Sequence, residues 1–285
     1  MRRDGDDILA ARPALNLIAL THFKEITMSI QDFSMDYFSL KGKSAIVTGG
    51  NSGLGQSFSL ALAKGGANVF IPSIIEEKGE TRELLEKEGV RAEFMVADIT
   101  QKGTPKQVVQ KCVDAFGQVD ILVNCAGICK VAKVEDFGRE EWDPMIAVNL
   151  TAAFEMSHEA ALKMIPRRSG KIINICSVFT FLGGWDSPAY AATKHGIAGL
   201  TKAYCEDLGK YNIQVNGIAP GYYATDITAG TRNDPEKNKL VLDHIPANRW
   251  GERLDLMGTT VFLASAASDY INGHILPVDG GYLVR

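Results

Sequence analysis

The chain has 285 residues, 46% of them hydrophobic, which is enough to bury one large core. Its formal net charge of −4 excludes a broadly basic surface for nucleic acid or anionic membranes, so a small-molecule partner is expected. No stretch approaches the roughly 20 apolar residues of a membrane span. The five cysteines include no Cys-x-x-Cys pair, and Cys125 and Cys129 lack a partner at ligand spacing. We therefore expect no disulfide framework, no metal site and a cytoplasmic location.

The N-terminus is expected to lie outside the fold. Its apolar stretch ILAARPALNLIAL superficially resembles an export signal, but the acidic DGDD and Pro13 argue against one. Met28 opens a second plausible start, which makes residues 1–27 an upstream extension. We expect residues 1–36 to be an extension outside the core. Residues 37–285 are expected to form a single dinucleotide-binding and catalytic domain.

From Lys43 onward, short apolar runs alternate with longer helical patterns. The helices include a long one over 140–165 and one near 254–265, and the expected strands are SAIVTG, NVFIP, AEFMVAD, DILVNCAG, KIINICS, IQVNGIAPG and HILPVDGG. This alternation predicts an α/β fold, a Rossmann-type doubly wound parallel sheet with helices on both faces. Between Gly221 and Pro246, a polar, turn-rich segment breaks the rhythm. It is typical of a lid or binding segment, with a disordered surface loop as the alternative.

The first expected strand runs directly into the glycine-rich stretch TGGNSGLG, which opens a helix. Glycines suit this position because the turn is tight and the backbone must approach a phosphate closely. The helix N-terminus adds free N–H groups and a positive dipole end. A plain turn is the alternative. We expect a dinucleotide pyrophosphate to contact this turn, at Gly49, Asn51, Ser52, Gly53, Leu54 and Gly55.

Two later strand ends are expected to border the same pocket, because ligands of open α/β sheets bind at the carboxyl ends of the strands. Asp98, followed by Ile99, ends the third strand and can accept a hydrogen bond from an adenine amino group. Asn124, Ala126 and Gly127 end the fourth strand, where small residues leave room for adenine and ribose. Each of these segments alone is also compatible with ordinary loop chemistry.

The stretch SVFTFLGGWDSPAYAATK contains the candidate reacting groups. Ser187 is a favourable N-cap and Pro188 suits the first helical position, so Tyr190 and Lys194 lie one turn apart on one helix face. A phenol with a pKa near ~10 needs a neighbouring cation to exchange protons at neutral pH, and Lys194 is placed to provide it. Ser177 follows a buried strand and would emerge at its C-terminal end. The alternative is a chance Tyr-x-x-x-Lys on an amphipathic helix.

Together these motifs resemble the short-chain dehydrogenase/reductase family over about residues 38–285. The resemblance rests on TGGNSGLG, Asp98, NCAG, Asn149 in VNL, Ser177, the Tyr190/Lys194 pair, Pro220, Gly221 and Thr225. Cys125 departs from it, since an asparagine is usual there. The segments IPANRWGERLDLMG and NGHILPVDGGYLVR further resemble the branch that contains gluconate 5-dehydrogenase and 2-dehydro-3-deoxygluconate 5-dehydrogenase.

The resemblance implies a role for each residue. Tyr190 would exchange a proton with the substrate while hydride passes to or from nicotinamide, Ser177 would hydrogen-bond the reacting oxygen, and Lys194 would lower the phenol pKa and hold the ribose. Asn149 would support a proton-relay water, or alternatively satisfy only backbone groups. A homotetramer is also implied. The nicotinamide half would be lined or capped by Val178, Ile218, Pro220, Gly221, Tyr223 and Thr225.

The second expected strand ends at Ser73, where relatives place either an acidic residue for a ribose hydroxyl or an arginine for a 2′-phosphate. Ser52 is not basic, and Glu76 and Glu77 are close. We therefore expect NAD, with NADP as the alternative because Lys78 could reach a 2′-phosphate.

The substrate is expected to be a sugar acid, ketose or polyol, whose secondary alcohol is interconverted with a ketone. No arginine lies between Ser177 and Tyr190, which weakens a sugar-acid assignment and leaves Lys130 as the candidate for an anionic group. Trp185 is expected at the rim of the substrate site or in an interface. Two alternatives remain: a 3-oxoacyl-[acyl-carrier-protein] reductase, and a non-catalytic nucleotide-sensing or scaffold protein.

Overall fold

The computed structural model describes residues 29–285. Of the expected extension over residues 1–36, residues 1–28 lie outside the described part. Residues 29–34 belong to a separate unit and contain a 3-10 turn over Ile30–Asp32. The domain boundary expected after residue 36 stays a prediction, and the fold below is that of the unit Met35–Arg285.

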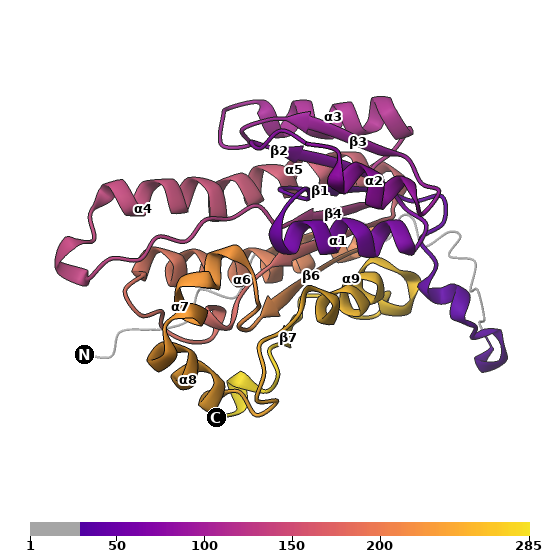
Figure 1. Cartoon of the computed structure of the whole chain (residues 1–285). Helices are drawn as coiled ribbons and strands as arrows, with labels where there is room; N and C mark the ends of the chain where they lie inside the picture. Colours follow the sequence, from indigo (N-terminus) through magenta and orange to yellow (C-terminus); the bar gives the residue numbers. More distant parts are fainter. Residues whose placement is uncertain (1–28) are drawn as a thin grey trace, which may run out of the picture. The chain divides into compact units, whose positions relative to one another are not determined.

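One parallel sheet of seven strands forms the centre of this unit (Figure 1). Its spatial order is β3-β2-β1-β4-β5-β6-β7, so the direction in which the chain crosses the sheet reverses between β1 and β4. The carboxyl ends of these two strands therefore border the crevice where such sheets bind ligands. The strands are β1 (Ser44–Val47), β2 (Asn68–Ser73), β3 (Ala92–Val96), β4 (Ile121–Asn124), β5 (Gly170–Ile175), β6 (Ile213–Pro220) and β7 (Ile275–Val278).

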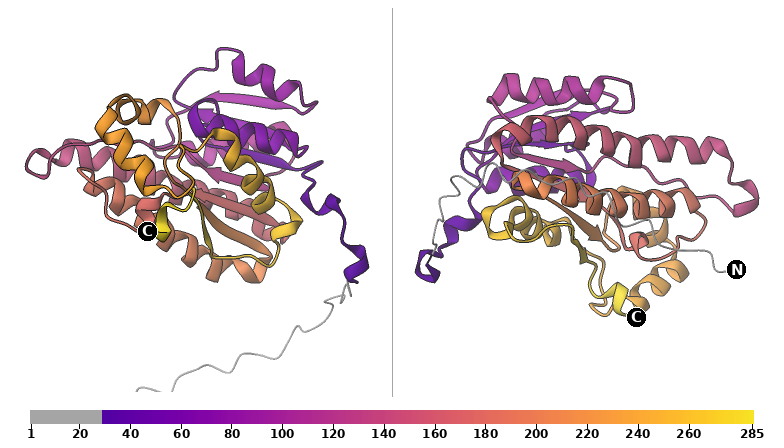
Figure 2. Two further views of the ribbon diagram at one scale, coloured as in Figure 1. Left: turned by 60° about the horizontal axis from the view of Figure 1, so that its bottom comes forward. Right: turned by 180° about the vertical axis from the view of Figure 1, so that it is seen from behind.

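Helices cover both faces of the sheet, as expected from the alternating pattern (Figure 2). In β1, Ala45 and Val47 pack into a core that Phe58 of α1 shares with Leu263 of α9. Ile46 points to the opposite face and packs into a second core with side chains of α3 and α5. Alternate residues of the strands thus serve two cores, which explains why the central strands read as unbroken apolar runs. The predicted α/β fold is confirmed.

Two helical regions differ from the expectation. The long helix over 140–165 is one continuous rod (Figures 1 and 2), but it contains a π-helical segment, Ile146–Thr151, between α4 and α5. The lid segment expected between Gly221 and Pro246 contains two helices, α7 and α8. The Asp234 side chain caps α8 by accepting hydrogen bonds from the backbone N–H groups of Glu236 and Lys237. The helices are α1 (Gly53–Lys64), α2 (Glu80–Glu86), α3 (Thr104–Phe116), α4 (Arg139–Met145), α5 (Ala152–Met164), α6 (Pro188–Leu208), α7 (Ala229–Asn233), α8 (Pro235–His244) and α9 (Met257–Ala264).

The turn from β1 into α1 leaves no room for a side chain at Gly55. A Cβ atom there would lie 2.2 Å from the carbonyl oxygen of Gly49, which is backbone and cannot rotate away. Overpacking of this kind typically costs about 1–3 kcal/mol. We expect Gly55→Ala to lower the free energy of unfolding by about that amount, measured by urea denaturation. Gly183→Ala is the control, because a Cβ there meets nothing within 4 Å; equal midpoints for the two variants would contradict the packing argument.

Candidate active site

The turn between β1 and α1 presents backbone amides to a possible anion. Gly49 and Gly53 adopt positive φ angles of 66° and 50°, which fold the chain back tightly before the helix. Ser52 stands at the N-cap of α1 but its side chain makes no cap hydrogen bond. The first N–H groups of α1 and its positive dipole end therefore suit a pyrophosphate.

Thr48 connects this turn to the loop after β4. Its hydroxyl oxygen accepts hydrogen bonds from the N–H groups of Cys125 and Ala126, both at 3.0 Å. Sequence reasoning quoted Thr48 within the glycine-rich stretch but gave it no role, because its partners lie 77 and 78 residues away. Cys125 is partly buried, and desolvation of its thiol raises the pKa to about 12. The backbone bonds to Thr48 thus hold the loop although the usual asparagine is replaced.

A cavity of about 210 Å³ lies at the carboxyl end of β2. Asn51 and Ser73 line it, together with Glu76 and Glu77. The Asn51 amide donates to the carbonyl of Ile75 at 2.8 Å, while its buried Oδ1 has no hydrogen-bond partner. The Ser73 hydroxyl oxygen accepts from the N–H of Ile75 at 3.1 Å. An unpaired acceptor next to a hydroxyl fits the adenosine ribose of a dinucleotide.

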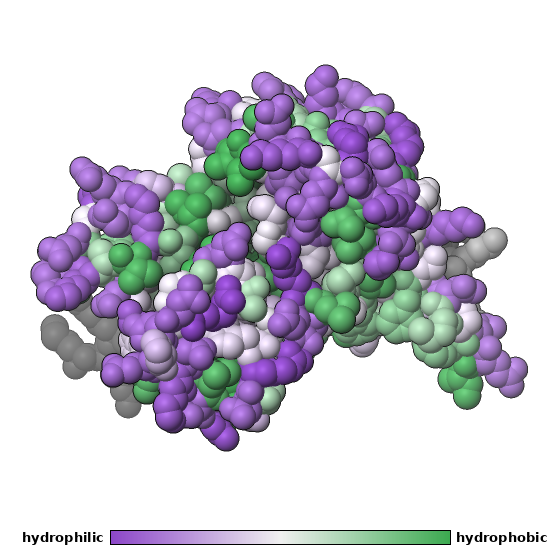
Figure 3. Space-filling view, in the orientation of Figure 1, coloured by the Kyte–Doolittle hydropathy of each residue, from purple (hydrophilic) through white to green (hydrophobic). Residues whose placement is uncertain are grey.

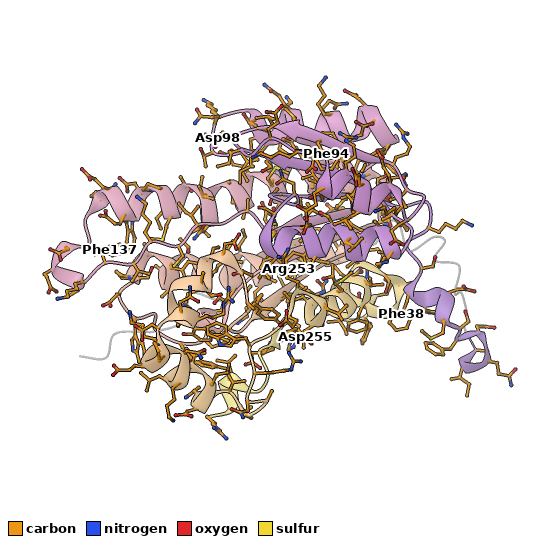
Figure 4. The ribbon with its side chains drawn as sticks, in the orientation of Figure 1. Phe38, Phe94, Asp98, Phe137, Arg253 and Asp255 are labelled. Atoms are coloured by element: carbon orange, nitrogen blue, oxygen red, sulfur yellow. The ribbon has the colours of Figure 1, made fainter. Side chains whose placement is uncertain are left out.

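Asp98 and Ile99 follow β3 but have different surroundings. Asp98 is exposed beyond the carboxyl end of the strand that contains Phe94 (Figure 4). Hydrogen bonds from Thr100 and Gln101 hold the pKa of the Asp98 carboxyl below its usual value, so it stays an acceptor at neutral pH. Ile99 is buried in the core on the α3 side of the sheet. Its side chain packs in the interior, so only its backbone remains available to a ligand.

The Asn124 side chain also faces the interior. Its Nδ2 donates to Asn174 Oδ1 at 2.8 Å and to Ser157 Oγ at 2.9 Å, and Asn174 in turn donates to Thr201 Oγ1 at 2.9 Å. This buried network joins β4, β5, α5 and α6 directly below the strand ends. The Asn124 amide nitrogen thus fixes the strand ends, while its buried Oδ1 has no hydrogen-bond partner. The cofactor contact expected at Asn124 stays a prediction.

Ser177, Tyr190 and Lys194 come together at the end of β5. The Ser177 Oγ accepts from the N–H of Phe179 at 3.2 Å, which leaves its hydroxyl hydrogen available to donate. The Tyr190 and Phe179 rings meet edge to face, with centroids 6.1 Å apart. Lys194 is buried, with its Nζ 5.4 Å from the centre of the Tyr190 ring and donating to the Ile175 carbonyl at 2.6 Å. One ammonium hydrogen is thus used by the protein and two remain for other acceptors.

Asn149 lies within the π-helical segment and is almost completely buried. Its amide binds the backbone of Ile128 twice, accepting from the N–H and donating to the carbonyl, both at 2.8 Å. Its Nδ2 also donates to Thr193 Oγ1 at 3.3 Å. The alternative in which Asn149 satisfies backbone groups describes contacts that are present. At Gly127, a Cβ would lie 3.3 Å from Asn149 Oδ1, so a small residue is needed there.

The segment after β6 places the candidate nicotinamide residues in two groups. Tyr223 and Ile218 are buried core residues, and the Tyr223 hydroxyl donates to the Val278 carbonyl at 2.9 Å. Ile218 packs in the interior, whereas Tyr223 also lines a cavity of about 240 Å³ beside Tyr222. The remaining candidates follow the chain out of the sheet: Val178, Pro220 and Gly221 are at the ends of β5 and β6, and Thr225 begins the lid.

Lys130 and Trp185 are both exposed, as expected for residues at a rim. Lys130 Nζ reaches the Glu140 carbonyl at 3.5 Å. Sequence reasoning missed a wall of four aromatic residues beside Tyr190, in which Phe179, Trp250 and Tyr282 each contact Tyr222, with ring centroids 5.1–6.5 Å apart. Burial keeps the Tyr222 phenol neutral by raising its pKa. This aromatic wall could be found only in three dimensions, because its members come from four separate segments.

Helix α6 begins at Pro188, as the sequence predicts, but Ser187 does not cap it. Its hydroxyl makes no hydrogen bond to the first turn of the helix and instead donates to the Lys130 carbonyl at 2.6 Å. Ser187 thus occupies the predicted N-cap position, but its side chain does not make the N-cap hydrogen bond.

Within residues 29–285, no helix combines the length and apolarity of a membrane span. In the same part of the chain, no three His, Cys, Asp or Glu side chains are grouped to hold a metal ion. Polar residues cover most of the face in Figure 3, with apolar residues exposed in separate spots.

Comparison with known proteins matches residues 43–236 to the short chain dehydrogenase family model. The chain is 69% identical to the uncharacterized oxidoreductase YgcW of Escherichia coli (strain K12) over 90% of this chain and 98% of that protein. It is 46% identical to the 2-dehydro-3-deoxy-D-gluconate 5-dehydrogenase of Bacillus subtilis (strain 168) over 88% of this chain and 98% of that protein. Among solved structures, the chain is similar to a gluconate 5-dehydrogenase from Burkholderia cenocepacia J2315 in complex with NADP and tartrate. The TM-score is 0.84 and the sequence identity 38%, over 88% of this chain and 98% of that chain. The chain therefore belongs to the short-chain dehydrogenase family and is an NAD(P)-dependent oxidoreductase of alcohol and ketone groups.

Proposed function

We propose that this enzyme interconverts a secondary alcohol and a ketone on a sugar acid, with Ser177, Tyr190, Lys194 and Asn149 as its catalytic set. The observation that carries the proposal is the convergence of Ser177, Tyr190 and Lys194 at the end of β5, on the same sheet edge as the turn before α1. The sugar-acid class is supported by relatives that are named for gluconate and 2-dehydro-3-deoxy-D-gluconate. A bound nicotinamide cofactor supplies or accepts the hydride.

The protein groups supply proton transfer and charge stabilisation. Tyr190 would exchange a proton with the substrate oxygen, and the Lys194 ammonium would stabilise the phenolate. The free hydroxyl hydrogen of Ser177 would donate to the reacting oxygen as its negative charge grows. Asn149 uses its amide on Ile128 and Thr193, so its contribution to a proton relay would be to fix the Ile128 carbonyl, with a second lone pair of Oδ1 left for water.

We also propose NAD as the preferred cofactor. Ser73 and the unpaired Asn51 Oδ1 suit a ribose diol, because a 2′-hydroxyl can donate to Oδ1 whereas a 2′-phosphate dianion has no hydrogen to donate. The guanidinium of Arg82 is the nearest basic group lining the cavity, but it donates to the Ala92 carbonyl and lies over the Phe94 ring. Glu76 and Glu77 add negative charge. The Burkholderia relative bound NADP, so this chain would differ from it.

The cofactor preference is testable by binding. We expect NADH to bind about 10-fold or more tightly than NADPH, as measured by nicotinamide fluorescence titration at fixed ionic strength. Asn51→Leu should weaken NADH more than NADPH, because loss of the bond to the Ile75 carbonyl affects both cofactors but only the 2′-hydroxyl also loses a partner. Equal or tighter binding of NADPH by the native enzyme would refute the preference.

We further propose a homotetramer in the cytoplasm. Phe154 and Leu162 of α5 are 47% and 50% exposed, and the Phe154 ring stacks on Tyr204 of α6. This apolar face on two long helices is suited to an interface between copies. All five cysteines are free thiols, which suits a reducing compartment.

The reaction is tested with a panel of gluconate, 5-keto-D-gluconate and uncharged polyols, each with both cofactors. Tyr190→Phe removes the hydroxyl proposed to exchange the proton while keeping the ring against Phe179. We expect turnover to fall by about 10³-fold or more, with the NADH dissociation constant changed by less than about 2-fold. Full turnover by Tyr190→Phe would contradict the mechanism.

Lys130 is the proposed anchor for the substrate carboxylate. Lys130→Ala should raise KM for gluconate about 5- to 10-fold and leave KM for an uncharged polyol unchanged, because an exposed ion pair contributes about 1 kcal/mol. Lys133→Ala, three residues further along the same loop, is the matched control. If KM for gluconate does not change in Lys130→Ala, Lys130 does not bind the carboxylate.

A further inference from the structure

Two loops flank the start of the helix that carries Tyr190. One is the loop after β4, residues 128–132. The other is the segment 184–187, which leads into α6. Ser187 is buried, and its hydroxyl donates to the Lys130 carbonyl at 2.6 Å across 57 residues of sequence. Next to it, the N–H of Ala132 donates to the Asp186 carbonyl at 2.8 Å. These two hydrogen bonds join the loops directly beside the first turn of α6.

Two local features at this connection depart from the usual geometry of a helix start. Asp186 adopts a positive φ of 51°, a conformation that is uncommon for a residue other than glycine. Ser187 leaves the first turn of α6 without a side-chain cap, although capping is what a serine ordinarily does at this position. Both departures serve the same end, since they direct a carbonyl and a hydroxyl toward residues 130–132.

The loop after β4 is thereby held at two independent points. At its base, Asn149 binds both backbone groups of Ile128 and also reaches Thr193 on α6. At its outer part, Ser187 binds Lys130. Between Ser187 and Tyr190 lie only Pro188 and Ala189. The Ser187 hydroxyl therefore acts together with the Ala132–Asp186 backbone bond to set the position of the outer loop relative to the Tyr190 phenol.

We propose that Ser187 is a positioning residue that fixes the substrate-side wall, residues 130–132, against the helix of Tyr190. The inference rests on the proposed function, in which Lys130 contacts the substrate. The turn before α1 and the cavity at the end of β2 make no contact with Ser187 among the hydrogen bonds of the described residues. Loss of the hydroxyl should thus affect the substrate and leave the cofactor unaffected.

The first test needs no substrate. Amide hydrogen exchange is measured on the full chain for the native protein, Ser187→Ala and Ser187→Thr, and resolved at Ala132 and Ile128. In Ser187→Ala, we expect the Ala132 amide to exchange about 10-fold faster. The Ile128 amide, held by Asn149, should be unchanged. Ser187→Thr keeps the hydroxyl and should restore the native rate.

The second test separates binding from chemistry. In Ser187→Ala, KM for the sugar acid that the native enzyme turns over should rise about 5- to 10-fold. The NADH dissociation constant should stay the same. Ser187→Thr should recover the native KM. Ser265→Ala is the matched control, because this buried hydroxyl donates only within its own turn, to the Phe262 carbonyl at 2.9 Å.

Each outcome decides the proposal. Native exchange at Ala132 in Ser187→Ala would overturn it. Faster exchange at both Ala132 and Ile128 would also overturn it, since that result means general destabilisation. Faster exchange at Ala132 with an unchanged KM would overturn the functional role of the wall. If the native enzyme turns over no sugar acid, the proposed function fails, whereas the exchange experiment still decides whether Ser187 positions the loop.

Discussion

The active site depends on the two hydrogen bonds between the Asn149 amide and the backbone of Ile128. An amide bound at both its donor and its acceptor ends has no rotational freedom, so it fixes the loop after β4 in position and orientation. Asn149 can reach that loop because the helix around it is π-helical over Ile146–Thr151, a local change of helical phase that is common at functional sites. The third bond, to Thr193, links the same point to the helix of Tyr190 and Lys194.

A second polar constraint lies one layer deeper. Asn124, Asn174, Ser157 and Thr201 hydrogen-bond one another in a region that excludes water. In such a low-dielectric setting, the loss of one partner leaves a buried polar group unpaired, which lowers the free energy of unfolding by about 1–3 kcal/mol. The network therefore favours one relative placement of β4, β5, α5 and α6. Because Ser177 follows β5 and Lys194 lies on α6, the network also fixes where these two proposed reacting groups lie.

Sequence predicted the parts of the site that depend on local pattern. Strand ends and helix starts follow from periodicity and from signals such as Pro188, which is why Ser177, Tyr190 and Lys194 converge as expected. No role was predicted for the Thr48 hydroxyl, and the Ser187 hydroxyl was expected to cap α6. Their actual partners are 77 and 57 residues away, whereas local rules favour nearby partners. The inward turn of Asn124 was missed for the same reason. Helices α7 and α8 were also missed, because the polar segment that forms them has too weak a periodicity to predict a helix.

The proposed reacting groups and the aromatic wall beside them lie on different kinds of structure. The reacting groups lie on the sheet edge and on α6, where hydrogen bonds across the core fix them. The aromatic wall is built instead from loops: Tyr222 follows β6, Trp250 follows the lid and Tyr282 is near the C-terminus. Trp250 also donates to Asn238 of α8 at 2.7 Å, and the Tyr282 ring contacts His244 at the end of that helix. Helix α8 is thus connected to Phe179 and Tyr190 through a continuous series of side-chain contacts. Loops can change sequence without disturbing the core, so the wall beside Tyr190 can vary while the sheet edge and α6 keep the proposed reacting groups in place.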